Sequence, residues 1–201
     1  MSRVEAELAD RVKPLSLAGD RTLPVHERLS GLLPDGLRRG AVVAVQGPGR
    51  ISLLLALLAG PSAAGSWCAM VGLPELGPLA AAELGVDLGR LALVPEPGPQ
   101  WATVAAALID GLDVVVLGAA LGVRPLDARR LVSRARQQGT VLVTDGSWPE
   151  KVDLLLTCRA QQWDGLEQGW GHLERRWIEV DSSGRGWNSR QRRHRVELGG
   201  R

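Results

Sequence analysis

The chain has 201 residues, of which 45% are hydrophobic, a length and composition that fit one folded domain with short tails. No apolar run is long enough for a transmembrane helix and residues 1–20 lack the hydrophobic segment of a secretory signal, so we expect a cytoplasmic protein without a membrane partner. The net charge is only +2, but residues 171–201 contain eight arginines and four acidic residues and are therefore basic. A basic segment favours an acidic partner, nucleic acid or protein, although a solubilising tail explains it equally well.

The predicted elements begin after an N-terminal arm over residues 1–25, where Pro14 and Pro24 interrupt any hydrophobic period. A buried strand is predicted over residues 41–45, and a glycine-rich turn and an apolar helix over residues 53–58 follow it. Further along the chain, strands are predicted over residues 65–72, 91–94, 114–117 and 140–144, and helices over residues 76–84, 101–109 and 125–138.

Strands that alternate with helices at this spacing predict an α/β fold, with a mostly parallel sheet covered by helices on both faces. The pattern changes after about residue 150, where strands over residues 152–159 and 172–180 have no helix between them and predict added antiparallel strands. A turn is predicted at residues 180–184, and residues 184–201 form either a basic tail or an edge strand. The predicted core domain therefore covers residues 26–183.

The turn after the first buried strand has the layout of a phosphate-binding loop without its reactive residues. Strand, glycine turn and helix is the geometry that places backbone N–H groups around a phosphate, and its sequence pattern is G-x-x-x-x-G-K-[ST]. When the pattern starts at Gly47, Leu53 takes the place of the lysine and Leu54 that of the Ser/Thr. Neither side chain can reach a phosphate or hold Mg²⁺, so we expect a vestigial loop and no cofactor. The residues of this vestigial loop are Gly47, Pro48, Gly49, Arg50 and Ser52.

Three segments resemble the RecA recombinase core in order and spacing. They are Gly47-Pro48 in the loop, Leu84-Gly85-Val86-Asp87-Leu88 after a helix, and Leu112-Asp113-Val114-Val115-Val116-Leu117-Gly118. The resemblance implies a RecA-like P-loop-type fold over roughly residues 31–121.

The same resemblance implies that the catalytic groups are missing. The Walker A lysine falls on Leu53, the Walker B aspartate on Gly118 and the catalytic glutamate on Leu73, while the adenine contacts fall on Gly77 and Ala80. Five missing groups argue against ATP hydrolysis and against an enzyme. The alternative is an atypical NTPase that uses Arg50 and Glu75, alone or completed by a partner; Arg50 is otherwise a surface arginine.

Motifs from about residue 25 onward also resemble the actinobacterial ImuA-prime proteins, which are described as RecA-like or SulA-like. They include Leu73-Pro74-Glu75-Leu76-Gly77, Arg130-Leu131-Val132-Ser133-Arg134-Ala135-Arg136, Trp163-Asp164-Gly165-Leu166 and Gly169-Trp170-Gly171-His172-Leu173-Glu174-Arg175-Arg176. This resemblance implies an accessory subunit of the translesion synthesis mutasome of the SOS response. Its implied partners are ImuB, a catalytically inactive Y-family polymerase homologue, and through ImuB the sliding clamp and an error-prone DNA polymerase. Binding to RecA itself is a further alternative.

Tryptophan and arginine concentrate near the C-terminus, where packing on the sheet, a protein interface and DNA binding are all open roles. The candidate partner-binding residues are Trp163, Trp170, Trp177, Arg185 and Trp187. The candidate DNA-binding residues of the basic tail are Arg190, Arg192, Arg193 and Arg195. The connections at residues 118–124 and 145–151 are too short for the DNA-binding loops of RecA.

Other chemistry has little support in the sequence. The histidines His26, His172 and His194 are dispersed, so we expect no metal site. Cys68 and Cys158 lie in apolar strands and are expected to be buried free thiols. Asp145 is either a simple turn residue or a ligand at the carboxyl edge of the sheet.

Overall fold

The structure is a computed structural model, and it describes residues 21–164, 175–185 and 191–198. The strands are β1 (Thr22–Leu23), β2 (Leu37–Arg38), β3 (Val42–Gln46), β4 (Cys68–Val71), β5 (Leu91–Val94), β6 (Val114–Leu117), β7 (Val141–Asp145), β8 (Leu154–Asp164), β9 (Arg175–Gly184) and β10 (Arg192–Glu197). The helices are α2 (Arg50–Ala63), α3 (Pro78–Glu83), α4 (Trp101–Gly111) and α5 (Pro125–Gln138), with short 3₁₀ helices η1 (Glu27–Leu29), η2 (Leu88–Arg90), η3 (Gly98–Gln100) and η4 (Ala119–Leu121).

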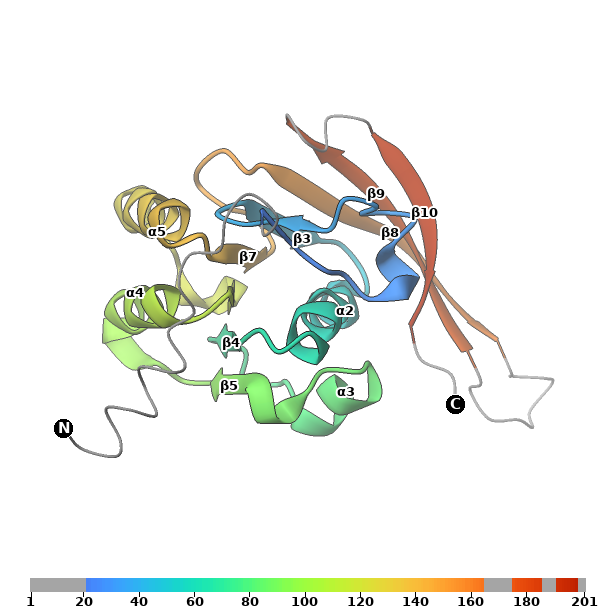
Figure 1. Cartoon of the computed structure of the whole chain (residues 1–201), viewed down its shortest axis with the longest axis horizontal. Helices are drawn as coiled ribbons and strands as arrows, with labels where there is room; N and C mark the ends of the chain where they lie inside the picture. Colours follow the sequence, from blue (N-terminus) through green and yellow to red (C-terminus); the bar gives the residue numbers. More distant parts are fainter. Residues whose placement is uncertain (1–20, 165–174, 186–190, 199–201) are drawn as a thin grey trace.

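Eight strands form one central sheet in the order β10-β9-β8-β3-β7-β6-β4-β5. The six strands from β8 to β5 run parallel, whereas β9 and β10 are antiparallel to their neighbours. Figure 1 shows α4 and α5 on one face of this sheet and α2 and α3 on the other. The predicted α/β architecture with added C-terminal antiparallel strands is therefore observed.

Helices on both faces explain why the central strands are apolar throughout. Val114 and Val116 pack into the core under α2, while Val115 and Leu117 pack into the second core under α4 and α5. Successive strand residues point to opposite faces, so a strand covered on both sides needs an apolar residue at every position. The four residues of β6 are all buried.

The C-terminal strands correct one prediction. A turn was expected at residues 180–184, but β9 continues to Gly184, which lies opposite Leu154 of β8. Asp181 and Ser182 have turn-forming side chains, yet both are buried within the paired strands. Backbone pairing with β8 and β10 outweighs the local preference of these residues for a turn.

The edges of the domain follow from the same pairing. β10 lies at the edge of the central sheet, beside β9. At the other end of the chain, residues 22–23 of the predicted arm form β1, which pairs with β2 in a small separate sheet.

Within the described residues, no helix has the length and apolarity needed to cross a membrane, and no group of three or more His, Cys, Asp or Glu side chains has a metal-binding arrangement. Cys68 and Cys158 are free and buried.

Candidate functional site

The loop between β3 and α2, which we call the glycine loop, has only three residues, Gly47–Gly49. Gly47 and Gly49 have φ values of +91° and +84°, which favour glycine. The helix begins at Arg50, earlier than the predicted Leu53, because Arg50 N–H donates to the Gly47 carbonyl at 3.3 Å and Leu53 N–H donates to the Gly49 carbonyl at 3.2 Å. Internal turn bonds thus use N–H groups that an open phosphate cradle would present to a ligand.

The two positions that would handle nucleotide belong to the core. Leu53 and Leu54 are both fully buried, and both pack in the apolar cluster beneath α2. A helix that is buried on nearly all sides has no face from which these positions can reach solvent. The residues that replace the lysine and the Ser/Thr therefore stabilise the fold.

Strands β8 and β9 pack directly against the glycine loop. A Cβ atom added to Gly47 would lie 2.1 Å from the carbonyl oxygen of Cys158 on β8, so only glycine fits there. A Cβ atom on Gly49 would lie 3.1 Å from Ile178 and 3.3 Å from a guanidinium nitrogen of Arg176, both on β9. The C-terminal strands therefore cover the turn that the sequence identifies as a vestigial phosphate loop.

Arg176 of β9 links these elements. Its Nη1 donates to Ser52 Oγ on α2 at 2.6 Å, and its Nη2 donates to Gln161 Oε1 on β8 at 2.6 Å. Partial burial lowers the pKa of the Arg176 guanidinium from its usual value. A protein cation thus bonds the one hydroxyl of the vestigial loop, Ser52.

Arg50, the cation at the start of α2, is also engaged within the protein. Its Nε donates to Asp145 Oδ1 at the end of β7 at 2.5 Å, and the Asp145 side chain is only 3% exposed. Glu75 is exposed in the loop after β4 and has no hydrogen-bond or salt-bridge partner within the described residues. The site thus pairs Arg50 with a carboxylate that lies at the carboxyl edge of the sheet, where the sequence placed it.

The position of the Walker B aspartate has no room for a side chain. A Cβ atom on Gly118 would lie 2.0 Å from the carbonyl oxygen of Gly72, at the end of the neighbouring strand β4. Gly118 N–H also donates to the Val71 carbonyl at 2.8 Å, which fixes this close approach. An aspartate would require the two strand ends to separate.

The C-terminal strands present a second group of polar side chains on the side of the sheet away from α2. We call this the outer face, and it comprises Arg159, Gln162, Trp177, Glu179, Asp181, Arg193, Arg195 and Glu197. Trp177 is half-buried, and the guanidinium carbon of Arg195 lies 4.5 Å from the centre of its ring. Arg195 Nη2 also donates to Gln162 Oε1 at 3.0 Å, so three strands contribute to one cluster.

Asp181 organises the arginines beside this cluster. Its carboxylate accepts from Arg193 Nε at 2.7 Å and from Arg159 Nε at 2.9 Å. The hydrogen bonds from Arg193 and then Arg159 lower the pKa of Asp181 below its usual value. Arg193, a predicted DNA-binding residue, is therefore neutralised by an acidic neighbour.

The remaining predicted residues are dispersed. Arg192 is half-buried opposite Ser182, and Arg185 is exposed just after β9, where its N–H donates to the Asp153 carbonyl at 3.0 Å. Trp163 lies in β8 opposite Arg176. Trp170, Trp187 and Arg190 lie outside the described residues.

Sequence reasoning missed Arg176, which bonds Ser52 and Gln161 beside the glycine loop. It also missed Asp181, which accepts from Arg159 and Arg193 on the outer face. Arg176 and Asp181 both lie on β9, and their contacts depend on the register between β8, β9 and β10. No local motif signals such contacts, because their partners lie as far away as Ser52 on α2. A correct alignment of the three strands is the only signal that could have identified them.

Comparison with known proteins places this geometry in context. The family model described as MT3502 N-terminal domain matches residues 31–150. The Mycobacterium tuberculosis protein Rv3395c, described as uncharacterized, is 46% identical over 143 residues, which are 68% of each chain. The crystal structure of the RadB recombinase has a TM-score of 0.57 and 16% identity, and the match covers 84% of this chain and 92% of that one. At this identity the likeness confirms the predicted RecA-like fold.

Proposed function

The chain belongs to the MT3502 N-terminal domain family, and we propose that it is a non-catalytic accessory subunit of a DNA-damage-induced translesion synthesis mutasome, of the ImuA-prime type. In this proposal its C-terminal region binds ImuB, and ImuB connects it to the sliding clamp and to an error-prone DNA polymerase. The observation that carries the proposal is that β8 and β9 cover the glycine loop. A RecA-like core with a covered loop can still bind a protein partner through its surface, but this loop has no space for the phosphates of a nucleotide.

The contacts of the glycine loop support a non-catalytic role. Leu53 occupies the lysine position at zero exposure, and Arg176 bonds Ser52. Phosphoryl transfer depends almost entirely on positioned cations around the phosphates, and within the described site both nearby arginines are held by other residues. These contacts support a protein that binds partners without turning over nucleotide.

The outer face supports a protein partner more than a nucleic acid. Tryptophan and arginine are favoured in interface hot spots, and Trp177 and Arg195 lie against each other on the outer face. The outer face also carries equal numbers of positive and negative side chains. Its three arginines are Arg159, Arg193 and Arg195, and its three acidic residues are Glu179, Asp181 and Glu197. A balanced surface matches a mixed protein surface, whereas a phosphate backbone requires an excess of positive charge.

The test is co-purification of the full chain with ImuB. Shortening the chain after residue 180 would remove part of β9 and all of β10, so point substitutions on the outer face are sharper. We expect Trp177→Ala and Arg195→Glu to lose ImuB while remaining folded, because they remove an aromatic anchor and reverse one charge. Arg130→Glu makes the same charge change at an exposed position on α5, outside the outer face, so it is the matched control and should retain ImuB.

The alternatives have separate readouts in the same preparation. An atypical NTPase that uses Arg50 and Glu75 would show a higher melting temperature with ATP and Mg²⁺, because a ligand that binds only the native state stabilises it. A DNA-binding module would bind single-stranded DNA with a steep salt dependence that is lost on neutralising Arg190, Arg192, Arg193 and Arg195. A regulator of RecA would co-purify with RecA and not with ImuB. Failure of the wild-type chain to hold folded ImuB would reject the proposal.

A further inference from the structure

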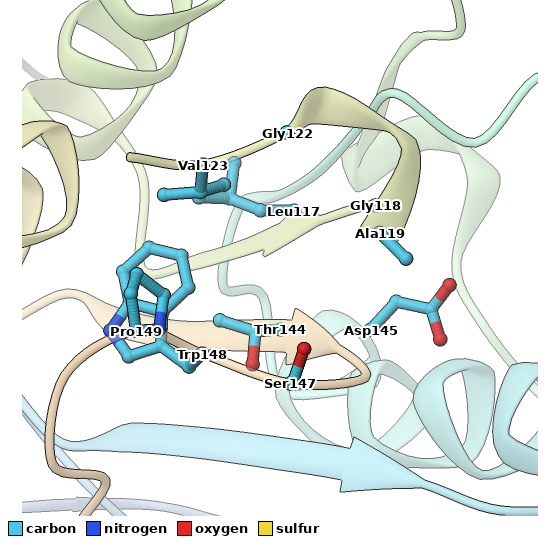
Figure 2. Close-up of a pocket in the computed structure, with 10 residues that line it drawn as sticks. All are labelled: Leu117, Gly118, Ala119, Gly122, Val123, Thr144, Asp145, Ser147, Trp148 and Pro149. Carbon is cyan, nitrogen blue, oxygen red and sulfur yellow. The ribbon is translucent and has the colours of Figure 1, made fainter. Parts of the chain in front are cut away.

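The cavity at the carboxyl ends of β6 and β7 contains a single charged side chain, the carboxylate of Asp145 (Figure 2). This carboxylate is bonded to Arg50, so the cavity belongs to the candidate site already described. Cations lie instead on α5, the helix that follows the connection after β6. Figure 1 shows α5 beside α4 on the face of the sheet away from α2. The proposed accessory role uses none of the arginines of α5.

Two grooves flank α5 and share Ser133 and Gln137 as lining residues. One, of about 720 Å³, lies between α5 and the connection from β7 to β8, and the other, of about 750 Å³, lies between α5 and α4. The lining holds two carboxylates, Asp127 and Glu150. It holds five cations, which define what we call the α5 face: Arg129, Arg130, Arg134, Arg136 and Lys151.

The excess of positive charge remains when the neighbouring ion-pair partners are included. These partners are Arg124 beside Asp127, Asp110 beside Arg134, and Asp153 beside Arg136. With them the surface contains six cations and four carboxylates, a net charge of +2. The outer face, in contrast, has equal numbers of both. The α5 face is therefore suited to an anionic partner.

Arg130 and Lys151 account for this excess. Both are exposed, and neither has a hydrogen-bond or ion-pair partner within the described residues. The paired arginines are also more exposed than the carboxylates that bind them: Arg129 is 72% exposed, whereas its partner Glu150, at 2.6 Å, is 27% exposed. Arg134 and Arg136 differ from their partners in the same direction. The carboxylates thus orient guanidinium groups that remain accessible to a ligand.

The other lining side chains favour phosphate groups on a backbone. Hydroxyl and amide groups bind phosphate oxygens alongside arginine and lysine, and Ser133, Gln137 and Thr103 provide them here. Neither groove has an aromatic side chain in its described lining. This composition disfavours single-stranded DNA, which stacks its bases on aromatic rings, and a protein interface, whose hot spots are rich in them.

We propose that the α5 face binds the phosphate backbone of double-stranded DNA. Arg130 and Lys151 bind phosphates directly, and the arginines held by carboxylates border the same path. No base is read, because phosphate contacts position a protein on DNA without carrying sequence information. The inference goes beyond the proposed accessory role, since binding ImuB does not require this chain to touch DNA. It also differs from the basic-tail alternative, which places DNA at the C-terminus.

The experiment follows binding of the full chain to a fluorescently labelled DNA duplex by anisotropy at several salt concentrations. Two phosphate contacts predict that the logarithm of the binding constant falls with the logarithm of salt concentration with a slope of about −2 or steeper. Arg130→Gln and Lys151→Gln should each reduce this slope by about one, which corresponds to about tenfold weaker binding in about 0.1 M salt. Both side chains are exposed and unpaired, so the melting temperature should not change.

Arg28→Gln is the matched control. It removes one positive charge from η1, whose Leu29 packs in the core on the α2 side of the sheet, and it should leave DNA binding unchanged. Co-purification with ImuB separates this inference from the proposed function. Arg130→Gln and Lys151→Gln should lose DNA and keep ImuB, whereas Trp177→Ala should lose ImuB and keep DNA.

Several results would overturn the inference. One is that the wild-type chain does not bind the duplex, and another is that it binds a single strand more tightly. An equal loss in Arg28→Gln would show that only the overall charge matters. Loss of DNA only on neutralising Arg190, Arg192, Arg193 and Arg195 would place it on the basic tail. Competition by polyglutamate as strong as that by unlabelled duplex would assign the α5 face to an acidic protein.

Discussion

The glycine loop and the outer face of the C-terminal strands both contain arginines, but in different surroundings. At the glycine loop, Arg176 lies against the backbone of a tight turn and bonds residues of two other elements. On the outer face, Arg193 and Arg159 share Asp181 at the protein surface, with side-chain exposures of 69% and 59%. The comparison separates a region where polar groups stabilise the fold from one where they remain available to a partner.

At the glycine loop, the positions where a phosphate loop has its lysine and Ser/Thr are apolar and buried. Leu53 adds to the core, and β8 and β9 cover the three-residue turn before the helix. Surface ion pairs contribute little to stability, so residues of the outer face can change while the fold persists. The two regions lie on opposite faces of β8 and β9, so we expect substitutions in them to behave differently.

The largest effect is expected from Leu53→Lys, which restores the missing lysine. The position is fully buried in an apolar cluster, so an unpaired ammonium there should lower the free energy of unfolding by about 4 kcal/mol or more. Urea denaturation measures the change, and a melting-temperature scan with ATP and Mg²⁺ should show no added stability. Leu79→Lys, at a leucine on α3 that is 72% exposed, should stay within about 0.5 kcal/mol of wild type. A stable, nucleotide-binding Leu53→Lys protein would contradict our view of the loop.

A smaller loss is expected from Gly47→Ala. The positive φ and the contact of 2.1 Å with the Cys158 carbonyl should together lower the free energy of unfolding by about 3 kcal/mol. Gly65 has a nearly equal φ of +89° but open space around it, so Gly65→Ala should cost only about 1 kcal/mol. Equal losses at the two glycines in urea denaturation would show that β8 does not press on the loop.

Arg176→Met should lower the free energy of unfolding by about 2 kcal/mol, because the hydrogen bonds to Ser52 and Gln161 involve a charged donor and are partly buried. Arg185→Met, at an exposed arginine beyond β9, should change it by less than about 0.5 kcal/mol. Denaturation midpoints of the two variants measure the difference directly. If Arg176→Met were as neutral as its control, the covering of the loop would have to rest on the Cys158 contact alone.

The smallest effect is expected at Asp181 and depends on pH. Two arginines hold its pKa below the usual value in the folded protein, so its contribution is complete above the unfolded pKa of about 4 and is lost as the pH falls through the folded pKa. Asp181→Asn should therefore flatten the loss of stability below pH 4, as followed by thermal melts across pH. The exposed Asp35 offers a control, since Asp35→Asn should leave the profile of the wild-type chain. An unchanged profile in Asp181→Asn would argue against the shared ion pair.

The sequence predicted most of the parallel half of the fold, because its signals are local. The bounds of β5, β6 and α5 coincide with the predicted ranges, since Pro95, the valine run at residues 114–116 and Gly139 mark them clearly. Predictions failed where distant pairing decides the outcome. Ser182 has the side chain of a turn residue, but it lies in β9 and pairs with Leu156 of β8. Helix α2 begins earlier than predicted because the turn before it has only three residues, Gly47–Gly49.

The candidate site was predicted only in part for the same reason. The loss of the lysine at Leu53 and of the aspartate at Gly118 can be derived from spacing alone. The contact of Arg176 with Ser52 cannot be derived in this way, because the two residues are 124 positions apart in the sequence. Likewise, the sequence placed Asp145 at the carboxyl edge of the sheet, but its pairing with Arg50 depends on how β7 lies beside β3.

The long separation between Ser52 and Arg176 also sets an order of events during synthesis. The ribosome makes the chain from its N-terminus, so β3, the glycine loop and α2 emerge well before β9 exists. Gly49 and Ser52 can gain their covering residue only when the last quarter of the chain has left the exit tunnel. Contacts that join distant segments form slowly, which makes the closing of this loop a late step in maturation. In a nascent chain that still lacks β9, Gly49 and Ser52 are therefore without the cover of Arg176.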